Sequence, residues 1–161
     1  MEILDIVDSG DNVVGQTSRE EIYSKKLHHR ICHVLIFDNQ NRMVLQKRSN
    51  HVSFFPDHWS TAVGGHVQTG ETYEQAALRE YKEELGANSP LTLMRKDLYQ
   101  VPNGPAKFLA TFKTNHDGPY TLEESAISSV HAFNLEEIKK MIEKKEKFHP
   151  ELLFILNKYF L

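Results

Sequence analysis

Apolar and polar residues along the 161-residue chain follow the pattern of short strands interrupted by a few helices. The first half predicts strands over four segments: 3–7, 13–17, 31–37 and 42–48. A helix is expected from Ser18, where Ser-Arg-Glu-Glu forms a capping box. The polar run 38–41 joins the third and fourth strands, which predicts a β-hairpin.

The second half continues the mixture without regular β-α-β alternation. An aromatic-rich loop at 49–60 precedes a short strand that leads into Gly64 and Gly65, and a helix follows. Further strands are expected over 91–101, 106–114 and 128–133, and further helices over 135–145 and from Pro150. This pattern predicts one α+β or sandwiched α/β domain over residues 1–161.

The helix after Gly65 has clear ends and two different faces. Thr72 is expected to cap it and Gly86 to stop it. At ~100° per residue, three acids fall within roughly a third of its circumference, namely Glu80, Glu83 and Glu84. A neighbouring packing face is predicted to hold Ala77, Leu78, Tyr81 and Leu85.

The acidic face of this helix works against helix stability. Like charges three or four residues apart cost about 0.2 to 0.5 kcal/mol per pair, and Glu83 and Glu84 lie at the negative end of the helix dipole. For a glutamate-rich helix in general, a solvated acidic face relieved by nearby Arg79 and Lys82 is the usual explanation. The alternative is a divalent-cation site, because hard cations such as Mg²⁺ take oxygen ligands.

The spacing of the acids favours the cation site. The segment from Gly65 through Glu71 to the run 79–87 resembles the Nudix box, G-x5-E-x7-R-E-U-x-E-E-x-G-U, where U is a bulky aliphatic residue. Every fixed glycine and charged position of the box is matched. Tyr81 and Ala87 depart from it at the U positions, which concern packing behind the helix.

This resemblance implies a Nudix fold, an α/β/α sandwich around a central mixed β-sheet, and a hydrolase that cleaves a nucleoside diphosphate linked to X or a related organic diphosphate. The implied cofactor is Mg²⁺, or Mn²⁺ in its place. The implied metal ligands are Glu80, Glu83, Glu84 and the Gly65 carbonyl. Arg79 and Glu71 are expected to form a supporting ion pair. The general base stays open between Glu80 and a loop acid outside the box, Glu123 or Glu124.

Most of the first 90 residues also resemble isopentenyl-diphosphate isomerase. The similarity runs through Gln46-Lys47-Arg48 and the segment 55–71 and back to His28-His29. The protonating cysteine of the isomerase falls on Gly64, which has no group to move a proton. Its later E-x-E acids have no counterpart in residues 106–112, whereas all the box glutamates are present. We therefore expect a hydrolase on the isomerase-like branch. Isomerase activity and a non-catalytic diphosphate-binding module are the alternatives.

Several residues outside the box are candidates for the site. Arg48 is a candidate contact for the diphosphate, because guanidinium binds phosphate bidentately. His29 and His66 match two metal ligands of the isomerase, but with the cysteine and acids missing, a hydrogen-bonding pair is the favoured interpretation. Phe54, Phe55 and Trp59 are expected to serve packing rather than substrate stacking.

Composition limits the remaining functions. The net charge is −3, with 40% hydrophobic and 25% charged residues, which gives no sign of nucleic-acid binding. A single cysteine, Cys32, lies in an apolar run and is expected to be a buried structural thiol. With no basic-then-apolar leader and no membrane-spanning run, we expect a cytoplasmic protein with a small-molecule diphosphate substrate, and a homodimer as the default assembly.

Overall fold

A computed structural model describes residues 2–161. In chain order its elements are β1 (Ile3–Val7), β2 (Val13–Ser18), α1 (Arg19–Ser24), β3 (His29–Phe37), β4 (Met43–Arg48), β5 (Trp59–Thr61), β6 (Val63–His66), α2 (Tyr73–Leu85), β7 (Thr92–Gln100), β8 (Ala106–Asn115), β9 (Ile127–Phe133), α3 (Leu135–Glu143) and α4 (Pro150–Tyr159). Each strand and helix expected from the sequence is present, with ends shifted by a few residues.

The main sheet has seven strands and mixes parallel with antiparallel pairing. Its backbone order is β5-β4-β3-β8-β7, while β6 pairs with β3 and β9 pairs with β4. The β3–β8 pairing is parallel and the other pairings are antiparallel. A separate hairpin consists of β1 and β2. A central mixed sheet is therefore confirmed.

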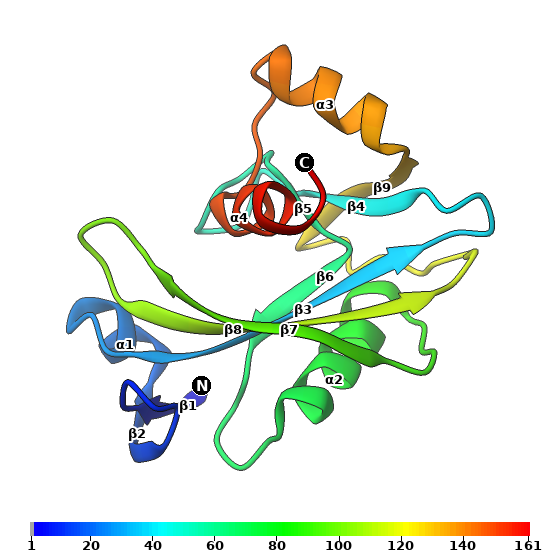
Figure 1. Cartoon of the computed structure of the whole chain (residues 1–161). Helices are drawn as coiled ribbons and strands as arrows, with labels where there is room; N and C mark the ends of the chain where they lie inside the picture. The colour runs from blue at the N-terminus through cyan, green and yellow to red at the C-terminus, as the bar shows by residue number, and fades with distance from the viewer. Residues whose placement is uncertain (1) are drawn as a thin grey trace.

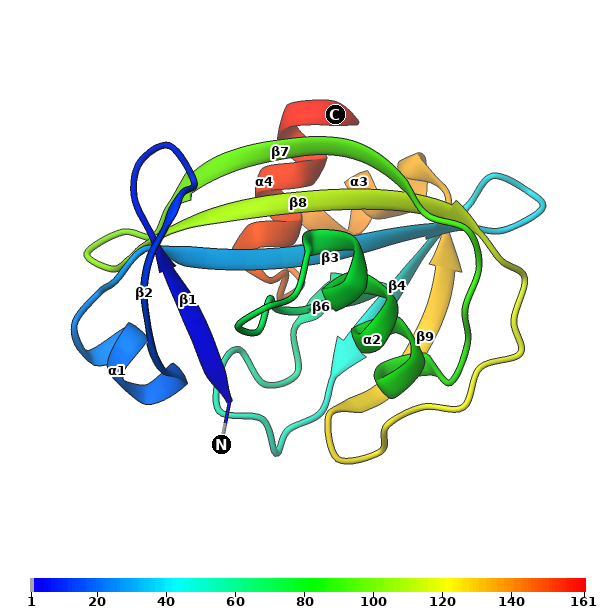
Figure 2. The same ribbon diagram turned by 90° about the horizontal axis from the view of Figure 1, so that it is seen from below.

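Helices cover both faces of this sheet (Figure 1). The helix α2 lies on one face, and α3 and α4 lie on the other, which confirms the predicted α/β/α sandwich. Viewed from the α2 side, α1 and the β1–β2 hairpin stand at one end of the sheet (Figure 2). No helix within residues 2–161 is long and apolar enough to cross a membrane.

The prediction that β3 and β4 form a hairpin is correct next to the turn, but the two strands do not pair along the rest of their length. Only Ile36 with Val44 and Phe37 with Met43 face each other as pairs. Beyond them β4 pairs with β5 and β9, and the first half of β3 pairs with β6. The sheet therefore forks between β3 and β4, and both strands contribute residues to the cavity described below.

Two apolar clusters hold the layers together. One lies under α2 and includes Cys32, Ala77, Tyr81 and Leu85, and the other lies under α4 and includes Leu152, Ile155 and Leu156. Cys32 is buried and forms no disulfide, as expected. Burial is the main reason why the pKa of its thiol is raised.

Two local predictions are wrong. Leu78 is 38% exposed, because the packing face of α2 is centred on Ala77 and Tyr81 and runs through Ala76 and Glu84 instead. At α1, Ser18 caps the helix by accepting from the Glu21 amide, but the Glu21 side chain pairs with Thr17 and Lys25 rather than returning to the cap. Only half of that capping box therefore forms.

Candidate active site

A cavity of about 940 Å³ opens beside α2. Its walls come from β3, β4, β6, the end of α2 and α1, together with the β4–β5 loop and the β7–β8 turn. We call the part formed by Glu80, Glu83 and Glu84 the acidic end, and the part formed by Arg19, Arg48 and Lys107 the basic end. All six residues line the same cavity.

Helix α2 is fixed at both ends by the residues that the sequence indicated. The Thr72 hydroxyl accepts from the Gln75 amide at 3.1 Å, and the Gln75 side chain accepts from the Thr72 amide at 2.9 Å. Gly86 ends the helix in the left-handed conformation with φ of 62°, which glycine adopts without strain. The register of the three glutamates is thereby set against β6.

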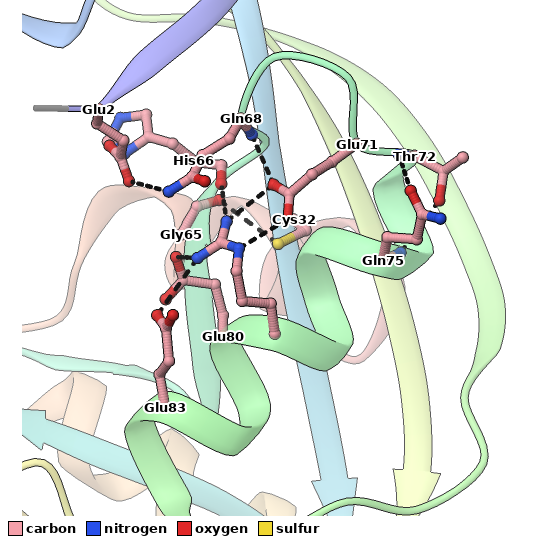
Figure 3. A network of polar contacts seen from close by, with 11 residues as sticks. Glu2, Cys32, Gly65, His66, Gln68, Glu71, Thr72, Gln75, Glu80 and Glu83 are labelled. Atoms are coloured by element: carbon pink, nitrogen blue, oxygen red, sulfur yellow. Dashed lines mark hydrogen bonds and ion pairs between the residues drawn. The ribbon is translucent and has the colours of Figure 1, made fainter.

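Arg79 is the centre of the polar network on this helix. Figure 3 labels its partners Glu71, Glu80, Glu83 and His66. Its Nε donates to Glu71 Oε2 at 2.7 Å and its Nη2 donates to Glu71 Oε1 at 2.9 Å, so the predicted ion pair is present and bidentate. Its Nη1 also donates to Glu80 at 2.8 Å and to Glu83 at 3.3 Å. Through Nη2 it reaches the His66 carbonyl as well, which fastens β6 to α2.

The three box glutamates do not converge on one point. Glu83 is exposed and turned to Arg79, whereas Glu84 is buried and accepts from the Gln46 side chain at 2.7 Å. Within residues 2–161 no group of three or more acidic, histidine or cysteine side chains is arranged as a metal cluster. Arg79 contacts two of these carboxylates, Glu80 and Glu83, and the role of the three acids as metal ligands stays a prediction.

Glu80 and Glu84 nevertheless form an electrostatically costly pair. Burial is the main cause that raises the pKa of Glu84 well above its ordinary value, and the adjoining Glu80 raises it further. Burial also raises the pKa of Glu80, although Arg79 partly opposes it. A buried carboxyl group beside a partly buried one favours the loss of charge unless a cation offsets it.

Gly65 leaves the space that the Glu80 carboxyl group occupies. A Cβ atom at position 65 would lie 2.6 Å from Glu80 Oε1 and 2.5 Å from Glu80 Cδ. Only a residue without a side chain therefore lets the carboxylate lie directly against the β6 backbone. The Gly65 carbonyl accepts a weak hydrogen bond from the Cys32 thiol at 3.5 Å and keeps lone-pair capacity for another partner.

At the basic end, Arg48 lines the cavity, and its contact with a substrate stays a prediction. It lies at the end of β4, and its Nε donates to the Phe54 carbonyl at 3.0 Å. No carboxylate of residues 2–161 forms an ion pair with it. Burial lowers its pKa, opposed in part by Glu84 and Glu151.

A buried ionic network that sequence reasoning missed supports this end. Glu151 on α4 accepts from Lys107 Nζ at 3.0 Å and lies 2.8 Å from His33 Nε2. His33 Nδ1 is 2.7 Å from the Thr61 hydroxyl. Despite burial, His33 and Lys107 hold the pKa of Glu151 far below its usual value. These residues come from four distant elements, so no local spacing reveals them.

His29 and His66 lie together as a stacked pair, with ring centroids 5.7 Å apart. The His66 Nε2 atom is 2.7 Å from the Tyr23 hydroxyl, and His29 Nδ1 is 2.9 Å from the Leu27 carbonyl. Burial lowers the pKa of His29 to about 4 and that of His66 well below its ordinary value. The hydrogen bonds that the sequence favoured are present, although His29 Nε2 is buried without a partner among residues 2–161.

The aromatic residues of the β4–β5 loop divide into two groups. Trp59 is buried in the core under α4, as predicted. Phe54 and Phe55 are 41% and 39% exposed and line the cavity, so the packing interpretation is wrong for both. Among the loop acids, Glu123 lines the cavity beside Glu84, whereas Glu124 is exposed and is not part of its lining.

Comparison with known proteins gives consistent matches. The NUDIX domain family model matches residues 27–153. A Yersinia pestis protein named as an uncharacterized Nudix hydrolase is 30% identical over 157 residues, which cover 98% of this chain and 85% of the relative.

Two solved structures show the same fold. The crystal structure of DR0079 from Deinococcus radiodurans superimposes with a TM-score of 0.84 at 25% identity, covering 99% of this chain and 100% of that one. The NUDIX domain of Shewanella oneidensis NrtR, crystallised with ADP ribose, has a TM-score of 0.61 at 16% identity over 80% of this chain and 83% of that one. The second similarity concerns the fold alone.

Proposed function

The chain belongs to the Nudix hydrolase family, and from this premise we propose that it is a Mg²⁺-dependent enzyme that cleaves the diphosphate bond of a nucleoside diphosphate linked to X or of a related organic diphosphate. Mn²⁺ is the expected substitute for Mg²⁺. The observation that carries the proposal is the pair of buried Glu84 and partly buried Glu80, with Glu80 lying against the Gly65 backbone.

The residues at the acidic end fit a divalent cation. Glu80 and Glu84 are carboxylates whose charges burial disfavours, and an oxygen-binding cation would stabilise both charges. The proposed ligands are Glu80, Glu83, Glu84 and the Gly65 carbonyl. Glu83 is exposed, and its contact with Arg79 is a 3.3 Å hydrogen bond, so its carboxylate is free to rotate toward the other two.

Residues other than the proposed metal ligands position those ligands and bind the substrate. When bound, the cation neutralises the diphosphate and lowers the pKa of coordinated water. Glu71 holds Arg79, and Arg79 holds Glu80 and the β6 carbonyl, so this pair positions the ligands. Arg48, which lines the same cavity, is proposed to bind a phosphate oxygen of the diphosphate.

The proton from the attacking water needs a base within the cavity. Two acids are suitably placed: Glu80 on α2, and Glu123 in the loop before β9. A Glu80→Gln variant and a Glu123→Gln variant separate them, because loss of the base removes the acidic limb of the pH profile of kcat while loss of a positioning acid only scales it.

We also propose that the chain lies on the isomerase-like branch while acting as a hydrolase. At position 64 an added Cβ atom would lie 3.1 Å from His33 Nδ1, and His33 is fixed by Glu151 and Thr61. A cysteine there would require this anchored imidazole to shift by a few tenths of an ångström. This crowding supports the exclusion of isomerisation of isopentenyl diphosphate; formation of the dimethylallyl isomer by the unmodified protein would overturn it.

The test is a panel of organic diphosphates incubated with the purified protein and Mg²⁺. We expect release of phosphate or of a nucleotide from at least one member, its loss in EDTA, and its loss in Glu83→Gln and Glu84→Gln. A Glu136→Gln variant on the exposed side of α3 is the control and should retain activity.

Two outcomes would contradict the proposal. Activity that survives both glutamate substitutions would remove the box acids from the reaction. Calorimetric binding of a diphosphate without turnover at any Mg²⁺ or Mn²⁺ concentration would identify a non-catalytic binding module instead.

A further inference from the structure

The basic end of the cavity contains a second arginine that the proposed reaction does not use. Arg19 is the first residue of α1 and lines the cavity. No carboxylate of residues 2–161 forms an ion pair with it, and its recorded side-chain contact is with the ring of Phe54, whose centroid lies 5.5 Å from the guanidinium carbon. A cavity-lining guanidinium without an anionic partner is available to a ligand.

Phe54 contacts both arginines of this end. Its carbonyl accepts from Arg48, and its ring packs against Arg19. The loop that carries Phe54 is anchored on Arg48, because the Arg48 amide donates to the His58 carbonyl and the Asp57 amide donates to the Arg48 carbonyl. Figure 2 shows α1 and this β4–β5 loop at the same end of the molecule.

The contacts of the two arginines differ. Arg48 donates to the Phe54 carbonyl and is within electrostatic reach of both Glu84 and Arg19. Arg19 packs on the Phe54 ring and is also within electrostatic reach of Tyr23 and His66. A diphosphate bound by Arg48 and the acidic end would leave the Arg19 guanidinium available to a further anionic group.

Lys107 adds a second cation beside Arg19. Its Nζ lies 5.3 Å from the centroid of the Tyr23 ring, and that ring is 5.1 Å from the ring of Phe54. Two carboxylates are also present at this end: Glu151, which is paired with Lys107 and His33, and Glu2, which faces His66 at 3.6 Å. Arg19 packs on Phe54 and Lys107 on the adjacent Tyr23 ring, so both cations add positive potential at this end of the cavity.

We propose that Arg19, supported by Phe54 and Lys107, binds a phosphate group that the substrate carries outside the diphosphate bond that is cleaved. This specificity rests on the proposed hydrolase function. A guanidinium on an aromatic ring presents its edge donors to two oxygens of one phosphate, a geometry that a hydroxyl group of an unphosphorylated substrate does not use. The preferred substrates are then diphosphates whose X group bears a phosphomonoester.

The first experiment measures inorganic phosphate binding to the metal-free protein in EDTA, by calorimetry. Without a cation the acidic end repels phosphate, so binding reports on the basic end. We expect saturable binding by the wild type, about ten-fold weaker binding by Arg19→Gln, and partial recovery in Arg19→Lys. Arg95→Gln is the matched control, because Arg95 also lies over an aromatic ring, 5.5 Å from the Tyr159 centroid, but outside the cavity lining.

The second experiment compares substrates that differ only by a phosphomonoester, for example ADP-ribose and its 2′-phosphate. The wild type should prefer the phosphorylated member, and Arg19→Gln should reduce that preference in kcat/KM by about ten-fold through KM. Equal phosphate affinity in Arg19→Gln and the wild type, or an unchanged preference, would overturn this proposal while leaving the hydrolase function intact. Arg19-dependent phosphate binding by a protein with no hydrolase activity would instead contradict the proposed function alone.

Discussion

The two ends of the cavity contain the same kinds of charged residue but use them in opposite ways. At the acidic end, Glu84 is buried and Glu80 is partly buried, both with too little positive charge, and the pKa of each is raised. At the basic end, Glu151 is equally buried, yet Lys107 and His33 satisfy both of its oxygens and its pKa is lowered. Burial alone therefore does not show whether a carboxylate serves stability or binding; its partners do.

This contrast assigns a physical role to each end. A carboxylate pair without sufficient counter-charge costs folding free energy, and a chain keeps it where a ligand supplies the charge. A fully paired carboxylate links elements, and Glu151 joins α4 to β3 and β8. Substitutions at the acidic end should therefore lower activity most, and substitutions in the network under the basic end should lower the free energy of unfolding most.

The largest effect is expected from Glu151→Ala. Removing the carboxylate leaves the Lys107 ammonium and the His33 imidazole buried without their partner, so the free energy of unfolding should fall by about 3–5 kcal/mol. Urea unfolding at neutral pH measures the loss. Glu143→Ala on exposed α3 is the control and should change stability by less than about 0.5 kcal/mol. If Glu151→Ala lowered the free energy of unfolding by less than about 1 kcal/mol, the ionic network would contribute little to stability.

At the acidic end, Gly65→Ala should damage activity more than stability. The added methyl group would overlap the Glu80 carboxyl group, and Glu80 is a flexible side chain that can move away. We expect kcat/KM to fall about ten- to a hundred-fold, as for other changes that displace a metal ligand. Gly15→Ala is the matched control, because its added Cβ would lie 3.5 Å from Ile6 Cδ1, an ordinary contact. Full activity in Gly65→Ala would show that the position of Glu80 is unimportant.

The pH dependence of stability should distinguish Glu151 from an ordinary carboxylate. The pKa of Glu151 is lower in the folded protein than in the unfolded chain. Its contribution to the free energy of unfolding is therefore present above the unfolded-chain pKa of about 4.3 and is lost as the pH falls below that pKa. The difference in unfolding free energy between the wild type and Glu151→Gln should shrink between neutral pH and about pH 3. A difference that stays constant over this range would contradict the ionised pair.

The smallest effect is expected at Leu78, on the same helix as the acidic end. Leu78 is 38% exposed, so Leu78→Ala should cost less than about 0.5 kcal/mol of unfolding free energy. Leu85→Ala, at a fully buried position of α2, should cost about 2–5 kcal/mol. Similar losses of unfolding free energy in the two variants would support the original prediction that Leu78 belongs to the packing face of the helix.

The sequence was informative where chemistry is local. Helix α2 carries its cap, its stop and its acids within one segment, and the resemblance of this segment to the Nudix box indicated the Arg79–Glu71 ion pair and the site's location. The side-chain orientations of the glutamates were not predictable, because Arg79 lies within ion-pair distance of three carboxylates. The pairing of Lys107 with Glu151 spans 44 residues, and Arg19 meets Phe54 only through the folding of α1 onto a loop. Such contacts depend on the topology of the sheet, which no short motif encodes.

The most direct test of the central claim is the effect of Mg²⁺ on the unfolding free energy of the wild type and of Glu84→Gln, measured at one pH. If Glu84 and its neighbours bind the cation, Mg²⁺ at 100 times its Kd should stabilise the wild type by roughly 2.7 kcal/mol, and Glu84→Gln should lose most of this gain. Equal stabilisation of the two proteins, or none of the wild type, would contradict the assignment of the acidic end as the metal site.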